Sequence, residues 1–312
     1  MSLSVYTIDC NYVEKEVACA YLMVEGKEAA FIENNTNQAI PFLLEELNKH
    51  SIQTSDVKYL IVTHIHLDHS GGTSGLLKHC RNAIVLAHPK AATHLINPSR
   101  LIDSASKVYG EENFKKLYGE IEPIPQEKVR IMNDGEELIF GDRTLKFIYT
   151  RGHANHHFVI YDSKTKGVFT GDSFGVGYPS LQKGTKPFLF PSTTPTDFDH
   201  DEAILSLEKI LNTGAEKAYL THFGEWTDLP LGYIQLKKGL DYFQKSLLSA
   251  VDSKSEDELQ NYFINENLEF FRAELKERGI EEELEKFVQF DIDINAQGLA
   301  FAAKRMKKKK VI

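Results

Sequence analysis

Four side chains of metal-ligating type lie within six consecutive positions of the stretch Thr63-His64-Ile65-His66-Leu67-Asp68-His69-Ser70-Gly71-Gly72. It follows a compact apolar run at residues 57–62, which predicts a buried strand. Imidazole and carboxylate groups at the end of a buried strand are costly unless a partner satisfies them. Alternation in an extended chain places His64 and His66 on one side, and Asp68 and His69 follow the bend. The two glycines allow that bend. The stretch therefore predicts a metal site with room for two ions.

Three isolated residues of ligand type lie further along the chain, and each follows a short apolar run that predicts a strand. They are His153, Asp172 and His222. Strand ends at one edge of a layered fold converge in space, and functional sites gather there. A single histidine is usually a surface residue or a satisfied core residue. That explanation fails for the whole set, whose donors suit zinc, with iron or manganese as alternatives.

The rest of the chain alternates between strand and helix patterns, which predicts a layered α/β fold. A helical insertion is expected at residues 89–120, and a long loop rich in Gly, Pro, Ser and Thr at 175–197. We expect a catalytic domain at residues 1–251 and a C-terminal helical extension at 252–312. Strands are predicted at 18–24, 29–33, 57–62, 83–87, 137–140, 144–149, 158–161, 167–170 and 218–221, and helices at 40–49, 73–80 and 199–212.

The histidine-rich stretch resembles the signature motif of the metallo-β-lactamase superfamily. Gly152-His153, Gly171-Asp172 and Thr221-His222 resemble the remaining ligand motifs of that family, in the family's order, over roughly residues 1–230. The resemblance implies an αββα sandwich with its metals at one edge. It also implies two metal sites that share one bridging carboxylate. Site 1 is His64, His66 and His153; site 2 is Asp68, His69 and His222; Asp172 bridges both.

Two cations about 3.5–4 Å apart hold a water between them and lower its pKa toward neutrality. The expected reaction is therefore attack by a metal-bridging hydroxide on an electrophilic centre. Asp172 and Asp68 are the expected catalytic residues, with Asp68 also a candidate proton shuttle to the leaving group. We expect two divalent metal ions as cofactors and a small ester, thioester or lactone as substrate.

Residues around the ligands offer candidates for an outer shell and a substrate pocket. The stretch from Gly152 to His157 resembles a glyoxalase II-like pattern, with His156 where that branch often has glycine. His157 either orients a ligand or pairs with the backbone at a strand start, and His156 is placed in the pocket wall. Tyr109, Tyr118, Phe188 and Phe190 line an apolar pocket or pack in the core.

Composition narrows the choice of function. A net charge of -9 argues against nucleic acid as the main partner, because phosphate binding needs a positive surface. The sequence contains no apolar run of membrane-spanning length, no signal peptide and no C-x-x-C pair. We therefore expect a cytoplasmic protein with reduced cysteines, a small-molecule substrate and no membrane partner, compatible with a homo-oligomer.

Four alternatives use the same kind of site. A phosphodiesterase or nuclease would use the same metal pair, and a persulfide dioxygenase would use a single iron. Flavodiiron proteins carry glutamate where this chain has His66, which argues against that class. Hydrolysis of β-lactams is disfavoured because that activity belongs to exported enzymes.

Overall fold

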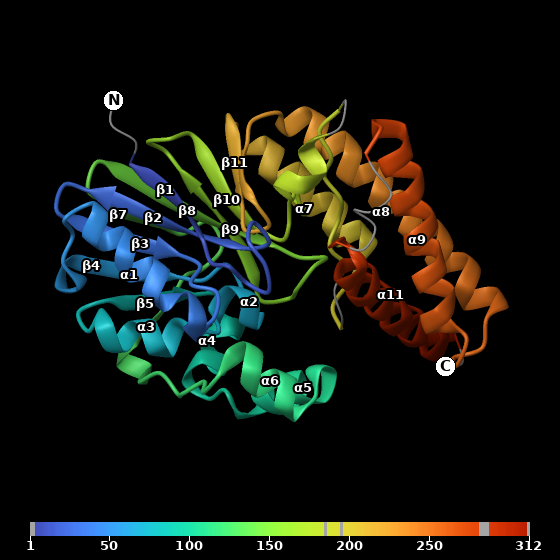
Figure 1. Ribbon diagram of the computed structural model, residues 1–312, viewed down its shortest axis with the longest axis horizontal. Helices are drawn as coiled ribbons and strands as arrows, with labels where there is room; N and C mark the ends of the chain where they lie inside the picture. Colours follow the sequence, from blue (N-terminus) through green and yellow to red (C-terminus); the bar gives the residue numbers. More distant parts are fainter. Residues whose placement is uncertain (1–3, 184–185, 194–195, 281–286, 311–312) are drawn as a thin grey trace. The chain divides into compact units, whose positions relative to one another are not determined.

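The computed structural model describes residues 4–183, 186–193, 196–280 and 287–310 of the chain (Figure 1). Its contacts group the chain into two compact units, and each unit is assembled from three separate stretches. The first unit comprises residues 1–149, 156–171 and 215–226; the second comprises 150–155, 172–214 and 227–312.

The N-terminal sheet of the first unit has its strands in chain order, β1-β2-β3-β4-β5-β6. Pairing is antiparallel from β1 to β3 and parallel from β3 to β6. Parallel neighbours need crossover connections, and helices α1 to α6 supply them here. The strands are β1 Val5–Asp9, β2 Cys19–Glu25, β3 Glu28–Ile32, β4 Val57–Ile61, β5 Ile84–Ala87 and β6 Val129–Ile131.

The second sheet of this unit has the order β12-β11-β10-β9-β8-β7. In this sheet β7 pairs antiparallel with β8, β9 with β10, and β11 with β12, whereas β10 and β11 run parallel. The helix that connects β10 to β11 belongs to the second unit. The strands are β7 Glu137–Phe140, β8 Arg143–Thr150, β9 His157–Asp162, β10 Gly167–Gly171, β11 Lys217–Leu220 and β12 Gly224–Trp226.

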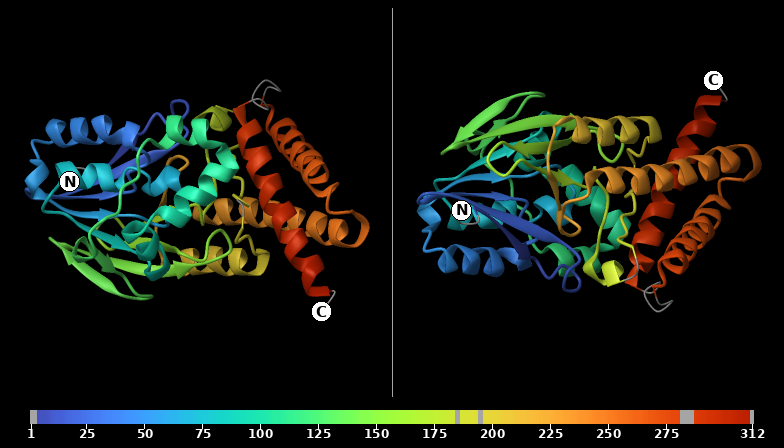
Figure 2. Two further views of the ribbon diagram at one scale, coloured as in Figure 1. Left: turned by 90° about the horizontal axis from the view of Figure 1, so that it is seen from below. Right: turned by 90° about the horizontal axis from the view of Figure 1, so that it is seen from above.

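The two sheets lie face to face, as the turned views in Figure 2 make plain. Strand β2 explains why, because it is apolar on both faces. Tyr21 and Met23 point into the core between the sheets, where they join Phe147 and Phe158 of the second sheet. Ala20 and Leu22 belong instead to the core on the outer face, under the helices. Such a doubly buried strand suits a sheet covered on both sides.

Helices of the first unit cover the outer face of the N-terminal sheet. Leu43 and Leu47 of the amphipathic helix α1 are buried in that outer core, together with Leu76 of α3 and Leu95 of α4. The predicted helical insertion is present as α4, α5 and α6. The bounds are α1 Ile40–Lys49, α2 Leu67–Ser70, α3 Thr73–His79, α4 Pro89–Ile96, α5 Ser99–Tyr109 and α6 Glu111–Tyr118.

The second unit is mainly helical. Its first two helices begin at side-chain caps: the Asp199 carboxylate accepts from the Glu202 N–H at 3.2 Å, and the Asp228 carboxylate accepts from the Leu231 N–H at 3.0 Å. Phe271 packs against Phe190 with ring centroids 4.8 Å apart, and Phe270 against Phe243 at 5.0 Å. The described helices are α7 His200–Asn212, α8 Leu229–Ser253, α9 Leu259–Arg278 and α11 Gln289–Lys310.

One buried cluster of charges links the two sheets of the first unit. Arg143 at the start of β8 donates through Nε to Glu25 of β2 at 2.7 Å and through Nη1 to Asp162 of β9 at 2.7 Å. Lys164 adds a contact of 2.8 Å to Glu25. The Arg143 side chain is fully buried, and both of its carboxylate partners are nearly so. The positive charges of this cluster therefore compensate the negative charges of its two carboxylates.

The fold agrees with the predicted elements, with a few corrections. Strands β1, β6 and β12 were not predicted, and β11 is followed by β12 although residues 218–221 were expected to form the final strand. Strands β6 and β12 are only three residues each, too short to leave a periodic pattern. The division into domains at residue 251 stays a prediction, and that residue lies in α8, two residues before its end.

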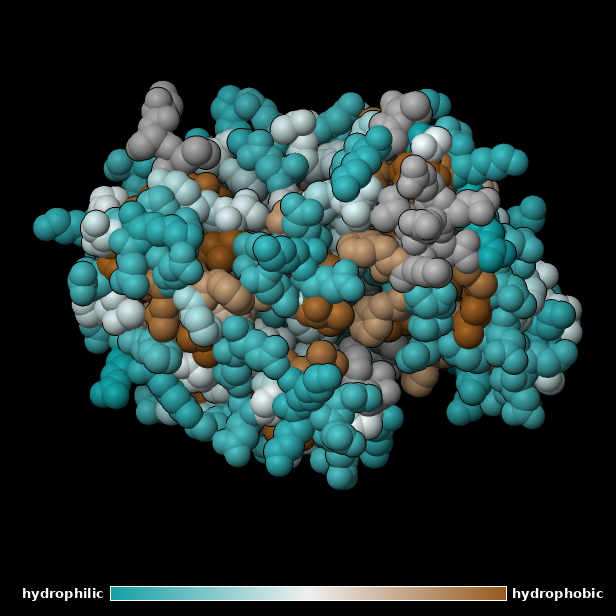
Figure 3. All heavy atoms as spheres, in the orientation of Figure 1, coloured by the Kyte–Doolittle hydropathy of each residue, from teal (hydrophilic) through white to brown (hydrophobic). Residues whose placement is uncertain are grey.

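The exposed surface is mixed in character. The face drawn in Figure 3 is largely hydrophilic, with separate apolar residues between charged ones. Among the described residues, no helix combines the length and apolarity needed to cross a bilayer.

Candidate metal centre

The histidine-rich stretch is held in place by the chain segment after β3. Strand β4 ends at Ile61, and α2 begins at Leu67. The backbone N–H groups of Asn34 and Asn35 both donate to the His69 carbonyl, at 3.0 and 3.2 Å, and Asn35 Nδ2 donates to the Asp68 carbonyl at 2.8 Å. This backbone docking fixes the short helix that carries Asp68 and His69.

The glycines at 71 and 72 are required by this docking. A Cβ atom at Gly72 would lie 2.8 Å from the Thr36 carbonyl oxygen, and one at Gly71 would lie 2.5 Å from that of Leu67. Both obstacles are backbone atoms, which cannot move aside cheaply. The Gly-Gly pair therefore permits close approach between the metal-ligating turn and the β3 end.

Within the first unit, Asp68, His69 and His222 form one cluster. Asp68 Oδ2 lies 3.3 Å from His222 Nε2 and 3.6 Å from His69 Nε2. The ligand-type atoms of the three side chains all lie within 4.8 Å of one another. His69 is fully buried, whereas the Asp68 side chain keeps a quarter of its surface exposed. The predicted site 2 set is thus brought together from α2 and the end of β11.

The contacts of the Nδ1 atoms of His222 and His69 indicate which ring nitrogen carries the proton. His222 Nδ1 lies 2.8 Å from the Val17 carbonyl oxygen, which can only accept. His69 Nδ1 lies 3.2 Å from Glu33 Oε1. In the neutral imidazoles these nitrogens are the donors, so both Nε2 atoms direct lone pairs at the Asp68 carboxylate, itself an acceptor. Acceptors that converge in this way fit a bound cation.

Glu33 also reaches His64. Thr63 Oγ1 donates to Glu33 Oε1, and His64 Nδ1 lies 3.0 Å from the same hydroxyl. The buried carboxylate therefore orients His69 directly and His64 through Thr63. Sequence reasoning treated Glu33 only as the end of a strand. A carboxylate that closes the otherwise apolar run Ala29-Ala30-Phe31-Ile32 was the signal available.

Three further histidines of the first unit, His66, His156 and His157, lie around His64. The His66 ring is 4.5 Å from the His64 ring, and the His157 ring is 4.8 Å from it. His156 stacks near-parallel to His64 at 6.1 Å, and its Nδ1 lies 3.5 Å from the Ile65 N–H. His157 is buried at the start of β9, and His156 is partly exposed.

Cys19 lies beside the strand that ends in His222. Its Sγ donates to the Leu220 carbonyl at 3.2 Å. Burial raises the pKa of this thiol to about 12, so it stays protonated and acts as neither a thiolate ligand nor a nucleophile.

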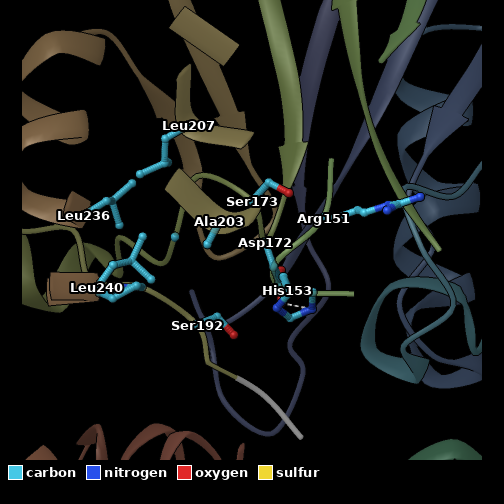
Figure 4. A pocket seen from close by; sticks show the side chains of 11 residues that line it. Arg151, His153, Asp172, Ser173, Ser192, Ala203, Leu207, Leu236 and Leu240 are labelled. Atoms are coloured by element: carbon cyan, nitrogen blue, oxygen red, sulfur yellow. Dashed lines mark ion pairs between the residues drawn. The ribbon is translucent and has the colours of Figure 1, made fainter. Parts of the chain in front are cut away.

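In the second unit, His153 and Asp172 face each other. His153 Nε2 lies 3.3 Å from Asp172 Oδ2, and both side chains are buried. They line a pocket whose opposite wall is apolar (Figure 4). Leu207 of α7, together with Leu236 and Leu240 of α8, forms that wall. The pocket holds only about 20 Å³, room for about one water molecule, and the three leucines are buried.

The aromatic candidates fall in different places. Phe188 and Phe190 are buried and pack against each other and against Phe271 of α9. Tyr118 is buried in the first unit with Tyr12 and Phe114. Tyr109 ends α5, but its side chain lies outside the described part of the structure.

Comparison with known proteins now adds to this geometry. A family model described as the metallo-beta-lactamase superfamily matches residues 28–222. The chain belongs to the metallo-beta-lactamase superfamily. The match includes every predicted ligand from His64 to His222. Proteins of this superfamily are generally metal-dependent hydrolases, and this chain is an enzyme of that kind.

Relatives and solved structures extend the match. A metallo-beta-lactamase fold-containing protein of Sulfurisphaera tokodaii is 28% identical over 215 residues, covering 67% of this chain and 74% of that protein. The crystal structure of an archaeal superfamily member from Sulfolobus tokodaii aligns with a TM-score of 0.65 at 24% identity, covering 96% of this chain and 99% of that one. A Thermus thermophilus family member also gives 0.65 at 20% identity, covering 98% and 94%.

Relatives with a named activity match over about half of their length. Hydroxyacylglutathione hydrolase of Prochlorococcus marinus is 24% identical, covering 55% of this chain and 56% of that enzyme. Atrochrysone carboxyl ACP thioesterase of Aspergillus chevalieri is 24% identical, covering 52% and 42%.

Proposed function

We propose that this enzyme is a binuclear hydrolase of a small ester, thioester or lactone. The observation that carries the proposal is the convergence of Asp68, His69 and His222. The Nε2 atoms of His222 and His69 lie 3.3 and 3.6 Å from Asp68 Oδ2, and the Nδ1 atoms of both histidines are held by the chain itself. A three-donor set of this composition suits a catalytic zinc site, and iron and manganese are the alternatives.

The full ligand assignment follows the family resemblance. The buried pairing of His153 with Asp172 supports it, because a neutral imidazole and a carboxylate 3.3 Å apart suit coordination of one cation. We assign His64, His66 and His153 to site 1, Asp68, His69 and His222 to site 2, and Asp172 to both.

The bound metal pair would supply an activated water and a Lewis acid for the substrate oxygen. Asp68 adds a group that moves a proton, because its side chain is the accessible member of its cluster. Glu33 and the Val17 carbonyl hold the imidazoles in the tautomer that presents Nε2. The remaining work of this chain is to bind and orient the substrate.

Two observations outside the metal centre favour an acyl substrate. The net charge of -9 disfavours a polyanionic substrate such as RNA or DNA. The names of the thioesterase and hydrolase relatives point the same way.

Metal analysis of the purified protein, followed by a substrate panel, tests the proposal. The panel is p-nitrophenyl esters, homoserine lactones, S-lactoylglutathione and bis-p-nitrophenyl phosphate. We expect two metal equivalents and turnover of at least one acyl substrate. Asp172→Ala and His66→Ala should abolish that turnover, and Lys166→Ala, at an exposed surface ion pair, should not affect it.

Two outcomes would overturn the proposal. Turnover of the phosphodiester alone would make the enzyme a phosphodiesterase. One iron per chain with oxygen consumption on a persulfide would make it a dioxygenase.

A further inference from the structure

The loop between β1 and β2, residues 10–18, has a strained backbone. Asn11, Val13 and Glu16 all adopt left-handed conformations, with φ of 49°, 63° and 61°. Such angles are disfavoured for residues with a Cβ, and most of all for a β-branched residue such as Val13. A loop of this kind keeps its shape only when its surroundings hold it there.

Asp9, the last residue of β1, provides one of these holds. Its Oδ1 accepts from the Asn11 N–H at 2.9 Å, and its Oδ2 accepts from the Glu16 N–H at 3.0 Å. One carboxylate thus clamps two of the three left-handed residues, one near each end of the loop. A charged acceptor makes stronger hydrogen bonds than a neutral one.

The loop is also docked on the helical insertion. The Tyr12 and Tyr118 hydroxyls lie 2.9 Å apart, and both rings are buried with Leu67, the residue before Asp68. The loop therefore contacts the metal-ligating turn on one side while Asp9 closes it on the other.

The functional end of this loop is Val17. Its carbonyl oxygen lies 2.8 Å from His222 Nδ1. The next strand is pinned to the same region, because the Cys19 N–H donates to the Thr221 carbonyl at 2.8 Å. This contact holds Nδ1 while Nε2 of the same ring lies 3.3 Å from Asp68 Oδ2.

We propose that Asp9 is a positioning residue for His222. It acts through the loop backbone, by holding the conformation that places the Val17 carbonyl against Nδ1. The inference rests on the proposed function, because it takes His222 as a ligand of site 2. It adds a residue that is separated from the ligands by a whole loop and touches none of them in the contacts described above.

The test measures metal affinity rather than turnover, by competition of the full-length protein with a chromophoric zinc chelator. Asp9→Ala should weaken binding of the second zinc equivalent about 10-fold, the lower end of the range for residues that orient ligands. Asp9→Asn keeps one acceptor oxygen and should fall between Asp9→Ala and the parent protein. The slowly exchanging Nδ1 proton of His222, assigned by its loss in His222→Ala, should disappear from the NMR spectrum of Asp9→Ala.

Glu136 supplies a matched control. Its carboxylate braces another turn in the same way, accepting from the Asn133 N–H at 2.9 Å, in the turn before β7. Glu136→Ala should lower the melting temperature while leaving the affinity for both zinc equivalents unchanged. Equal losses of zinc affinity in Asp9→Ala and Glu136→Ala would reduce the effect to general destabilisation and overturn the inference.

The experiments distinguish failure of the proposed metal-site assignment from failure of the proposed role of Asp9. If the parent protein binds one equivalent, or His222→Ala still binds two, the proposed site assignment is wrong. If His222→Ala loses the second equivalent while Asp9→Ala binds zinc like the parent protein, only the role of Asp9 is wrong.

Discussion

The first unit contains two buried clusters of charged and polar side chains, and they differ in one respect. Around Arg143, a guanidinium and an ammonium face two carboxylates, so the chain supplies both signs of charge. Around Asp68, a carboxylate faces two imidazoles whose protons point outward to Glu33 and Val17. The first cluster is complete in itself. The second is arranged for a cation from solution, and that difference separates a structural cluster from a functional one.

Asp68→Ala gives the largest expected effect. Removing the only carboxylate among the three donors should reduce turnover to the background rate and release the second metal equivalent. Circular dichroism should stay unchanged, because the backbone of α2 is held by Asn34 and Asn35. Metal analysis together with kinetics checks this. If a folded Asp68→Ala protein kept both metal equivalents, the Asp68 cluster could not be distinguished from the Arg143 cluster as a metal site.

Arg143→Met probes the other cluster. Two carboxylates would be left buried without their shared cation, and breaking a buried ion pair costs about 3–5 kcal/mol. The free energy of unfolding, from urea titration monitored by circular dichroism, should fall by that amount, while turnover per folded molecule stays unchanged. A stability close to that of the parent protein would mean that Glu25 and Asp162 find other partners.

Glu33→Gln tests the bracing of the metal-facing cluster. His69 and the Thr63 hydroxyl both contact Glu33 Oε1, and the Thr63 N–H donates to Oε2 at 3.4 Å. A neutral amide oxygen accepts more weakly than the charged carboxylate, and the amide nitrogen cannot accept from the Thr63 N–H. Metal affinity should fall about 10- to 100-fold. Glu25→Gln is the matched control, a buried carboxylate of the same unit that contacts Arg143 instead of a ligand. Equal zinc affinity in the Glu33→Gln and Glu25→Gln proteins would contradict the assignment.

The smallest expected effect is a change in stability at acidic pH. Burial raises the pKa of Glu25, but hydrogen bonds from Lys164 and Arg143 outweigh it, so the pKa lies below its ordinary value of 4.5. A carboxylate with a lowered pKa stabilises the fold above its unfolded pKa and loses that contribution as pH falls through the folded value. In chelator-treated protein, the stability gap between parent and Glu25→Gln should hold above pH 4.5 and shrink below it. A gap that widens in acid would reverse the sign of this linkage.

The sequence predicted most of the fold because the main elements carry strong patterns. Helix α1 was predicted with its observed bounds, and the strands that lead to the ligand motifs were predicted within about two residues. Strand β1 was missed because its polar residues weaken the apolar signal. The short strands β6 and β12 depend on neighbours for their pairing.

The support of the site was less visible from sequence. A backbone carbonyl such as that of Val17 exists at every position, so no residue type marks it. Glu33 is an ordinary acidic residue until the fold brings it to His69, and Asp9 is one until it holds the loop that ends at Val17. The ligand residues themselves could be predicted because their chemistry is confined to a few residue types with recognisable spacing.

The position of β11 near the end of its sheet has a consequence for how the protein is made. A ribosome delivers His64, His66 and His69 early, and His222 only after eleven of the twelve described strands have been synthesised. The unfinished chain presents imidazoles to whatever metal the cell offers, yet it lacks the donor that closes the cluster. On the proposed assignment, selection of the resident ion is therefore left to the completed polypeptide.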